Sequence, residues 1–121
     1  MENKYPEHIL NLIEWLEEKK AEDIKILDVK EQTDFADYIV LCNGSSGLHM
    51  KAIADNVIAK AKENKLQLYS KEGTNNDWWI LLDFIDTVLH IFSYEARNYY
   101  KIEEIFDKTK QIKQTANQSE K

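Results

Sequence analysis

The chain has a single cysteine, no long apolar run and no internal repeat. Cys42 permits no internal disulfide, and such cysteine usage is typical of a reducing compartment. No apolar run approaches the roughly 18 residues of a membrane-spanning helix. The N-terminal residues also lack the basic and apolar regions of a secretion signal. We therefore expect a soluble, cytoplasmic protein that has no membrane partner.

Positive charge is scarce in the first 107 residues. Residues 108–121 hold four lysines against Glu120, a net charge of +3, and the total of −6 therefore leaves −9 on residues 1–107. Phosphate backbones repel such a surface, because lysine and arginine supply most non-specific affinity for nucleic acids. We expect no direct nucleic-acid recognition and a basic protein partner. Only Ile112 and Ala116 are apolar in residues 108–121, which are predicted to form a disordered Lys/Gln-rich tail.

Apolar spacing predicts three helices and five strands. Helices are expected over residues 7–20, from the Gly44–Gly47 turn to about residue 63, and from Tyr94 to Phe106. Strands are expected at residues 24–29, 38–42, 66–69, 77–83 and 86–92. This order implies one α/β domain over residues 1–107, with a mixed five-stranded sheet, two long helices and a short C-terminal helix. The long helices can cover one face of the sheet, which leaves apolar area on the other.

The last two predicted strands indicate which face has a role besides the core. If Phe84 and Ile85 join them, three cross-strand pairs follow: Asp83 with Asp86, Leu81 with Val88, and Trp79 with His90. One face is then apolar and consists of Trp78, Ile80, Leu82, Leu89 and Ile91. The other carries an aromatic and aliphatic strip with acidic edges, formed by Trp79, Leu81, Asp83, Asp86, Val88, His90 and Phe92. Such a strip predicts a binding surface.

Two polar motifs could carry other chemistry. The turn from Gly44 to Gly47 could cradle a phosphate at a helix N-terminus, although helix capping by Ser45 or Ser46 explains it as well. Asp83 and Asp86 flank the predicted hairpin, and Asp37 or Asp77 could lie near them. These carboxylates could bind a divalent metal together, or Asp83 and Asp86 could simply be solvated turn residues.

Other reactive side chains have simpler interpretations. The three histidines lack the spacing of zinc ligands, and Cys42 has no base beside it in sequence, so we expect no metal site and no thiol nucleophile. Residues after the last strand include Glu95, Arg97 and two tyrosines. Tyrosine and arginine are frequent at binding hot spots, but Glu95 and Arg97 could also pair with each other on the surface.

From Ile9 to Phe106 the sequence resembles the ribosomal silencing factor family, also called the RsfS or Iojap family. Two blocks lie around the predicted second helix: Asp37-Tyr38-Ile39-Val40 leading to Gly44-Ser45-Ser46, and His49 with Ala52-Ile53-Ala54-Asp55. The others follow it: Glu72-Gly73, Trp79-Ile80-Leu81-Leu82-Asp83, Asp86-Thr87-Val88-Leu89-His90-Ile91-Phe92 and Glu95-Ala96-Arg97-Asn98-Tyr99-Tyr100. The family often has glycine at the position of Ile85.

The resemblance implies a nucleotidyltransferase-like fold without enzyme activity or cofactor. It also implies a translation repressor that binds ribosomal protein fourteen of the large subunit and sterically blocks joining of the small subunit in nutrient-poor conditions. We expect the partner-binding residues to be Trp79, Leu81, Asp83, Asp86, His90, Glu95, Arg97 and Tyr100. The alternatives are a metal-dependent nucleotidyl transferase on the same fold and a homodimeric adaptor. The uncovered strip also predicts a homodimer when the protein is free.

Overall fold

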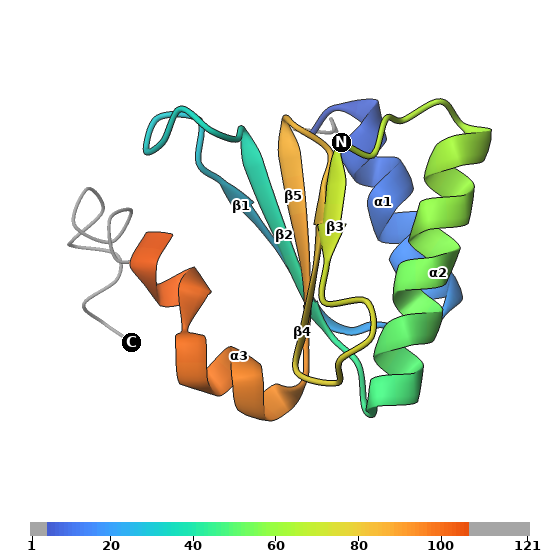
Figure 1. The fold of residues 1–121 in the computed structure, drawn as a ribbon. Helices are drawn as coiled ribbons and strands as arrows, with labels where there is room; N and C mark the ends of the chain where they lie inside the picture. The colour runs from blue at the N-terminus through green and yellow to red at the C-terminus, as the bar shows by residue number, and fades with distance from the viewer. Residues whose placement is uncertain (1–4, 107–121) are drawn as a thin grey trace.

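A computed structural model of the chain describes residues 5–106 (Figure 1), so the predicted tail at residues 108–121 lies outside the described residues. The three helices are α1 (Glu7–Glu18), α2 (Gly47–Glu63) and α3 (Tyr94–Tyr100). The five strands are β1 (Glu22–Asp28), β2 (Tyr38–Asn43), β3 (Ser70–Glu72), β4 (Trp79–Asp83) and β5 (Thr87–Phe92). The predicted α/β class and element order are confirmed.

One sheet contains all five strands, in the order β1-β2-β5-β4-β3. β2 and β5 pair in parallel, and the other neighbours pair antiparallel, so the sheet is mixed as predicted. β5 therefore lies at the centre although it comes last among the strands. All six residues of β2 are buried, which explains its unbroken apolar sequence from Tyr38 to Cys42.

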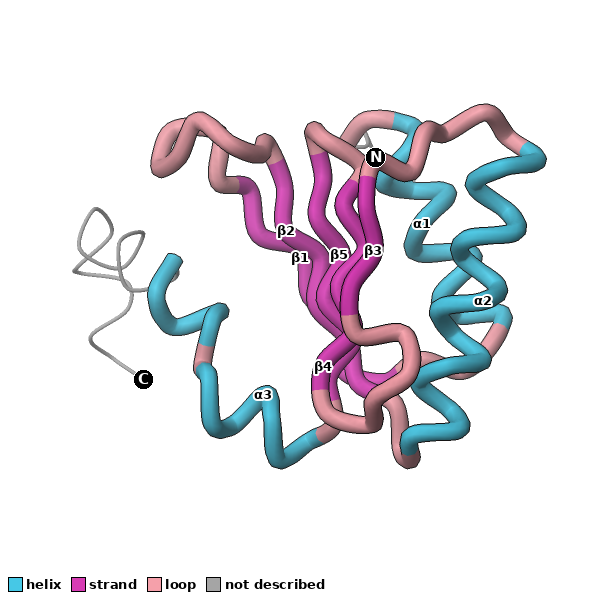
Figure 2. The backbone as a smooth tube through the Cα atoms, in the orientation of Figure 1, coloured by secondary structure: helices cyan, strands magenta, loops and turns pink. Residues whose placement is uncertain are grey.

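The helices form separate layers on the two faces of the sheet, as Figures 1 and 2 show. The face under α1 and α2 holds the larger core, to which Leu12, Leu16 and Ile53 belong. A smaller core on the other face contains Leu27, Val29, Ile39, Leu41, Phe92 and Ala96, and α3 and residues 102–106 lie over it. The first turn of α2 is capped by Ser46, whose Oγ accepts the amide proton of His49 at 3.1 Å.

Two predicted elements differ from the structure. The third strand is Ser70–Glu72 rather than residues 66–69, because Leu66 and Leu68 pack against the larger core without joining the ladder. The last helix is not continuous to Phe106. Lys101 takes a left-handed backbone conformation with φ 51°, which ends α3, and a further helical turn follows at residues 102–106.

The predicted register of the β4–β5 hairpin is wrong by two residues. The structure pairs Asp83 with Val88, Leu81 with His90 and Trp79 with Phe92. The ladder continues to the next pair, because the amide of Phe84 donates to the carbonyl of Thr87 at 2.8 Å. A shift of two residues keeps every side chain on its predicted face, since the side-chain period of a strand is two.

The hairpin closes through a three-residue turn that is strained at Ile85. The amide of Asp86 donates to the carbonyl of Phe84 at 3.0 Å, and Ile85 between them has φ 78°. This is the geometry of a γ-turn with positive φ, which is unfavourable for a β-branched residue. The surroundings hold it in place, because Phe84 is buried and the Asp86 carbonyl accepts the amides of Asp37 and Tyr38.

We predict that Ile85→Gly stabilises the fold by about 1 kcal/mol. The substitution relieves backbone strain of roughly 1–3 kcal/mol, and this gain exceeds the cost of the conformational entropy that glycine adds to the unfolded chain. Little burial is lost, because Ile85 is 53% exposed. Urea unfolding at neutral pH measures the change. Ile85→Val is the control: it keeps the branched side chain and should leave the free energy of unfolding almost unchanged. A less stable glycine variant would contradict the strain.

Candidate functional site

Six aromatic side chains come together where α3 meets the ends of β4 and β5, and we call them the aromatic cluster: Trp78, Trp79, His90, Phe92, Tyr99 and Tyr100. The Trp79 ring is central, with centroids 4.5 Å from Tyr100, 5.1 Å from Phe92 and 5.6 Å from His90. Tyr99 extends the cluster outward, 4.9 Å from Tyr100 and 6.4 Å from Trp78. Strand residues thus form its base and helix residues its outer part.

Exposure within the cluster differs from the prediction at three positions: Trp78, Phe92 and His90. Trp78 was expected in the core, but it is 37% exposed. β4 begins at Trp79, and the Asn76 Oδ1 accepts the amides of both Trp78 and Trp79 at 2.9 Å, although the Trp78 carbonyl still accepts the amide of Ser93 at 3.0 Å. Phe92, expected on an open surface, is buried in the smaller core with Ala96 of α3. The exposed part is formed by Trp78, Tyr100 and Tyr99, the last 72% exposed.

His90 orients the Trp79 ring through a hydrogen bond. The Trp79 Nε1 donates to the His90 Nδ1 at 2.9 Å. An indole nitrogen can only donate, so the Nδ1 of His90 carries no proton and the ring is neutral with its proton on Nε2. Burial lowers the pKa of His90 to about 4, which favours this form. His90 is only 6% exposed, and its influence on a partner therefore acts through Trp79.

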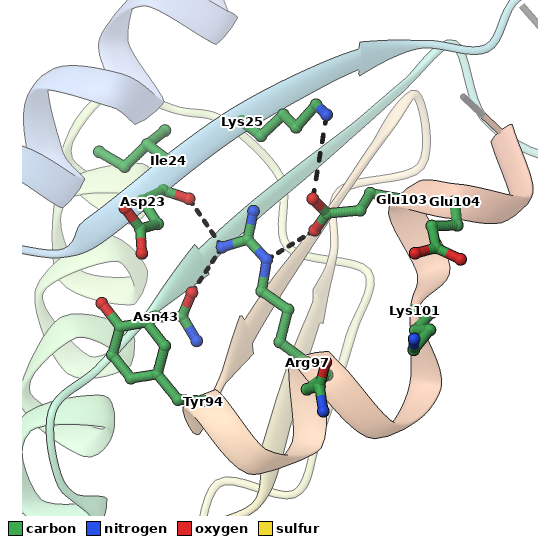
Figure 3. A pocket seen from close by; sticks show the side chains of 10 residues that line it. Asp23, Ile24, Lys25, Asn43, Tyr94, Arg97, Lys101, Glu103 and Glu104 are labelled. Atoms are coloured by element: carbon green, nitrogen blue, oxygen red, sulfur yellow. Dashed lines mark hydrogen bonds and ion pairs between the residues drawn. The ribbon is translucent and has the colours of Figure 1, made fainter. Parts of the chain in front are cut away.

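Arg97 fixes α3 on the sheet. Its Nη1 donates to the Asp23 carbonyl at 2.7 Å and to the Asn43 Oδ1 at 2.5 Å, and its Nε donates to the Glu103 carboxylate at 2.6 Å (Figure 3). The irregularity in β1 between Glu22 and Lys25 contains Asp23, whose φ is 49°. Arg97 therefore pairs with Glu103 and not with Glu95, so the predicted alternative of a surface pair between residues 95 and 97 is wrong.

Asn43 completes this network and was missed by the sequence analysis. Its Nδ2 donates to the carbonyl of Phe92 at 3.1 Å, so one amide side chain joins β5 to the guanidinium of Arg97. A polar residue directly after five apolar residues was the available signal. The side chains around the network line an open cavity of about 520 Å³, and those labelled in Figure 3 carry both signs of charge.

Among the remaining predicted partner-binding residues, Leu81 lies beside the aromatic cluster and the acidic residues lie outside it. Leu81 is half-buried beside Glu72 of β3, and a groove of about 310 Å³ runs past both to Trp79 and Tyr100. Asp83 has a structural role, since its Oδ1 accepts the amide of Ile85 at 2.8 Å. Asp86 at the hairpin and Glu95 on α3 are exposed. The structure thus groups Trp79, Leu81, His90 and Tyr100, and it does not bring Asp83, Asp86, Glu95 or Arg97 into the same cluster.

The geometry contradicts the alternative of a nucleotidyl transferase that uses Asp83, Asp86 and the Gly44 turn together. β2 and β5 run parallel from the pair Tyr38–Thr87 to the pair Asn43–Phe92. Gly44 follows the last of these pairs and Asp86 precedes the first, so they lie at opposite ends of the sheet, ~20 Å apart. Among residues 5–106, no three His, Cys, Asp or Glu side chains converge in a way that could hold a metal ion.

Neither the Cys42 thiol nor the length of the helices points to a further function at this site. Burial raises the pKa of the Cys42 thiol to about 12, which favours the protonated form. None of the helices in the described part of the chain is long and apolar enough to cross a membrane.

An exposed aromatic surface that is held in place by part-buried hydrogen bonds is typical of a binding protein. The family model described as "Ribosomal silencing factor during starvation" matches residues 2–121, and the chain belongs to this family. It is a ribosome-associated regulatory protein and not an enzyme.

Individual relatives agree with this assignment. A ribosomal silencing factor of Bacillus subtilis is 37% identical over 90 residues, which are 74% of this chain and 76% of that protein. A crystal structure of a Chromobacterium violaceum protein superposes on this chain with a TM-score of 0.78 at 33% sequence identity. The match covers 79% of this chain and 80% of the chain in that structure. The Mus musculus protein named "Mitochondrial assembly of ribosomal large subunit protein 1" is 30% identical over 78% of this chain and 43% of its own length.

We predict that protonation of His90 destabilises the protein below pH 6.5. The histidine of the unfolded chain binds a proton near pH 6.5, whereas the folded chain resists protonation until about pH 4. Stability is therefore complete above pH 6.5 and falls as the pH drops towards 4, by about 2 kcal/mol at pH 5. Urea unfolding of the wild type and His90→Gln from pH 7.5 to 5 isolates this term, because the carboxylates contribute equally to both. Equal pH slopes would contradict a buried neutral histidine.

Proposed function

We propose that the chain represses translation by binding ribosomal protein fourteen of the large subunit through the aromatic cluster, where it sterically blocks joining of the small subunit. The protein would act in the cytoplasm during starvation. The observation that carries the proposal is the outward part of the cluster, Trp78, Tyr99 and Tyr100, beside the groove that reaches Leu81. Membership of the silencing factor family supports the ribosome as the partner. The printed name of the mouse relative supports the large subunit.

The physical properties of the cluster suit a hot spot. Tyrosine and tryptophan bury much area while losing few rotatable bonds, and they dominate binding energy where they sit on a rigid base. The base here is rigid because His90 fixes Trp79 and Arg97 fixes α3. Binding would therefore have a small ordering cost, which leaves more of the contact energy for affinity.

Charge supports a basic partner on the same side of the molecule. Glu72 lies opposite Leu81 on the α3 face of the sheet, and Asp83 lies on that face two residues further along β4. The exposed Asp86 adds a third carboxylate at the hairpin. Opposite charges across an interface accelerate encounter and reject partners of the wrong sign. An acidic border of this kind fits a lysine- and arginine-rich ribosomal protein.

The exposed part of the cluster would also bind a second copy of the chain when no ribosome is present. Exposed aromatic side chains are a common basis of self-association. Homodimer formation and ribosome binding would then compete for the same area. The similarity of the fold to nucleotidyltransferases stays a prediction, and it carries no part of this proposal.

We predict that Trp78→Ala and Tyr99→Ala each weaken binding to purified large subunits by roughly thirtyfold, since hot-spot side chains contribute about 2 kcal/mol or more. Both are exposed, so the free energy of unfolding should change little compared with Trp79→Ala. Trp79 is a poorer probe, because its loss also removes the bond to His90. Co-sedimentation measures binding, and analytical ultracentrifugation measures the dimer.

Leu48→Ala is the matched control for these variants. Leu48 is 82% exposed and lies on α2, on the opposite face of the sheet. It should bind large subunits as the wild type does. Wild-type affinity in both aromatic variants would place the interface elsewhere on the protein and sink the proposal.

We also predict that Glu72→Lys with Asp86→Lys slows association with large subunits and removes most of its salt dependence. Asp83 is left unchanged because it caps the hairpin turn. The control is Glu14→Lys with Glu17→Lys, the same change of charge at two exposed positions of α1. Association rates across a salt series decide the matter: equal losses in both double variants would mean that only net charge matters, with no local acidic border.

A further inference from the structure

Three segments that are distant in sequence meet at the end of the sheet where the β4–β5 hairpin turns. The amide of Asp37, at the end of the loop between β1 and β2, donates to the Asp86 carbonyl at 2.7 Å. The amide of Tyr69, directly before β3, donates to the Asp83 carbonyl at 2.7 Å. The hairpin turn therefore lies between the other two segments, at the top of the sheet in Figure 1.

Each of these segments exposes one large apolar side chain, and we call the three the end patch: Phe35, Tyr69 and Ile85. Phe35 and Tyr69 are each 69% exposed, and Ile85 is 53% exposed. About three strand spacings of ~4.8 Å separate β2 from β3, so the end patch spans ~15 Å. The aromatic cluster is at the opposite end of β4 and β5, where Trp79 pairs with Phe92. The two surfaces are therefore separate.

The backbone at Ile85 indicates that its side chain has a role outside the fold. A φ of 78° is unfavourable for a β-branched residue, whereas glycine adopts it without strain. Burial recovers little of this cost, because more than half of the side chain is exposed. Backbone strain of this kind is typical of positions where the side chain serves a function. An apolar side chain that is kept exposed at a cost to stability suits contact with a partner.

Carboxylates border the end patch, and no basic side chain of residues 5–106 pairs with them. Asp34, Asp37 and Asp86 are all exposed, and no ion pair of the described residues includes them. The lysine in the β1–β2 loop, Lys30, pairs with Asp28 at 3.3 Å. An occupant of the end patch therefore needs positive charge together with apolar surface.

Charge also decides between the possible occupants. A second copy of the chain would place the same carboxylates against one another in a symmetric contact, which like-charge repulsion disfavours. Nucleic acid would bring its phosphates towards them. A lysine- and arginine-rich protein segment with an apolar side chain complements both the carboxylates and the apolar area. The end patch therefore fits a basic protein.

We propose that the end patch is a second docking surface, which binds a lysine- and arginine-rich protein segment of the large subunit. Phe35 and Ile85 supply the apolar contact, and the carboxylates of Asp34 and Asp86 receive the basic side chains. The turn at Ile85 thereby gives up stability of the fold for affinity. Only the large subunit as the source of the segment rests on the proposed function.

Ile85→Gly separates this role from a general loss of structure. The variant should be more stable than the wild type in urea and yet bind purified large subunits about tenfold more weakly, because it relieves the strain and removes the contact. Ile85→Val is the matched control and should keep both stability and affinity. Phe35→Ser should weaken binding to a similar extent and leave unfolding unchanged. Wild-type affinity of either Ile85→Gly or Phe35→Ser in co-sedimentation would overturn the proposal.

A photo-crosslink identifies the occupant. p-Benzoylphenylalanine in place of Phe35 should attach the chain to a ribosomal protein when the complex with purified large subunits is irradiated. The same group in place of Leu48, which is exposed on α2, is the control and should give no such product. A cross-link from position 35 to ribosomal RNA, or to a second copy of the chain, would overturn the proposed occupant.

The aromatic variants keep this test separate from that of the proposed function. If Trp78→Ala and Tyr99→Ala bind weakly while Ile85→Gly and Phe35→Ser bind as the wild type does, the end patch is not a docking surface and the proposed function stands. The reverse pattern would support the end patch and overturn the role of the aromatic cluster. A wild type that does not bind large subunits would overturn both.

Discussion

The arrangement of side chains on the α3 face depends on the hydrogen bonds of one guanidinium group, that of Arg97. Arg97 reaches from α3 to the Asp23 carbonyl in β1 and to the Asn43 amide at the end of β2, and Glu103 balances its charge. These bonds act with the buried Ala96 and with the Tyr94–Glu22 hydrogen bond to fix the angle at which α3 leaves β5, and that angle brings Tyr99 and Tyr100 to the two tryptophans. A seven-residue helix has too little internal stability to hold that position alone. The polar network therefore creates the aromatic surface.

Sequence patterns predicted the fold well where burial imposes a period. The helical stripe of α1 and the apolar run of β2 are dictated by the core, and both elements appear at the expected positions. The faces of β4 and β5 were also correct, because parity survives a shift of two residues. The pattern failed where local hydrogen bonds decide. Asn76 accepts the amide of Trp78 just before β4 begins, and the strained turn at Ile85 shifts the register. Apolar periodicity carries no information about either feature.

The candidate site was only partly predictable for the same reason. Trp79 and Tyr100 were identified by their chemistry, and the structure places their rings 4.5 Å apart. His90 was expected to meet a partner directly, yet it lies beneath the surface and orients Trp79. Arg97 was interpreted as a surface residue, because sequence spacing cannot reveal that its guanidinium donates a hydrogen bond to a carbonyl 74 residues away. Residues that support a site thus resemble contact residues in the sequence, and only their burial separates the two roles.

The strand order has a consequence for the synthesis of the protein. β5 fills the centre of the sheet but is the last strand to be made, and the Glu103 partner of Arg97 follows it. The α3 face cannot assemble on a nascent chain until almost all of the domain has emerged, because its contacts join the earliest strands to the latest helix. The aromatic surface of a protein with this topology therefore forms only when the synthesis of its domain is nearly complete.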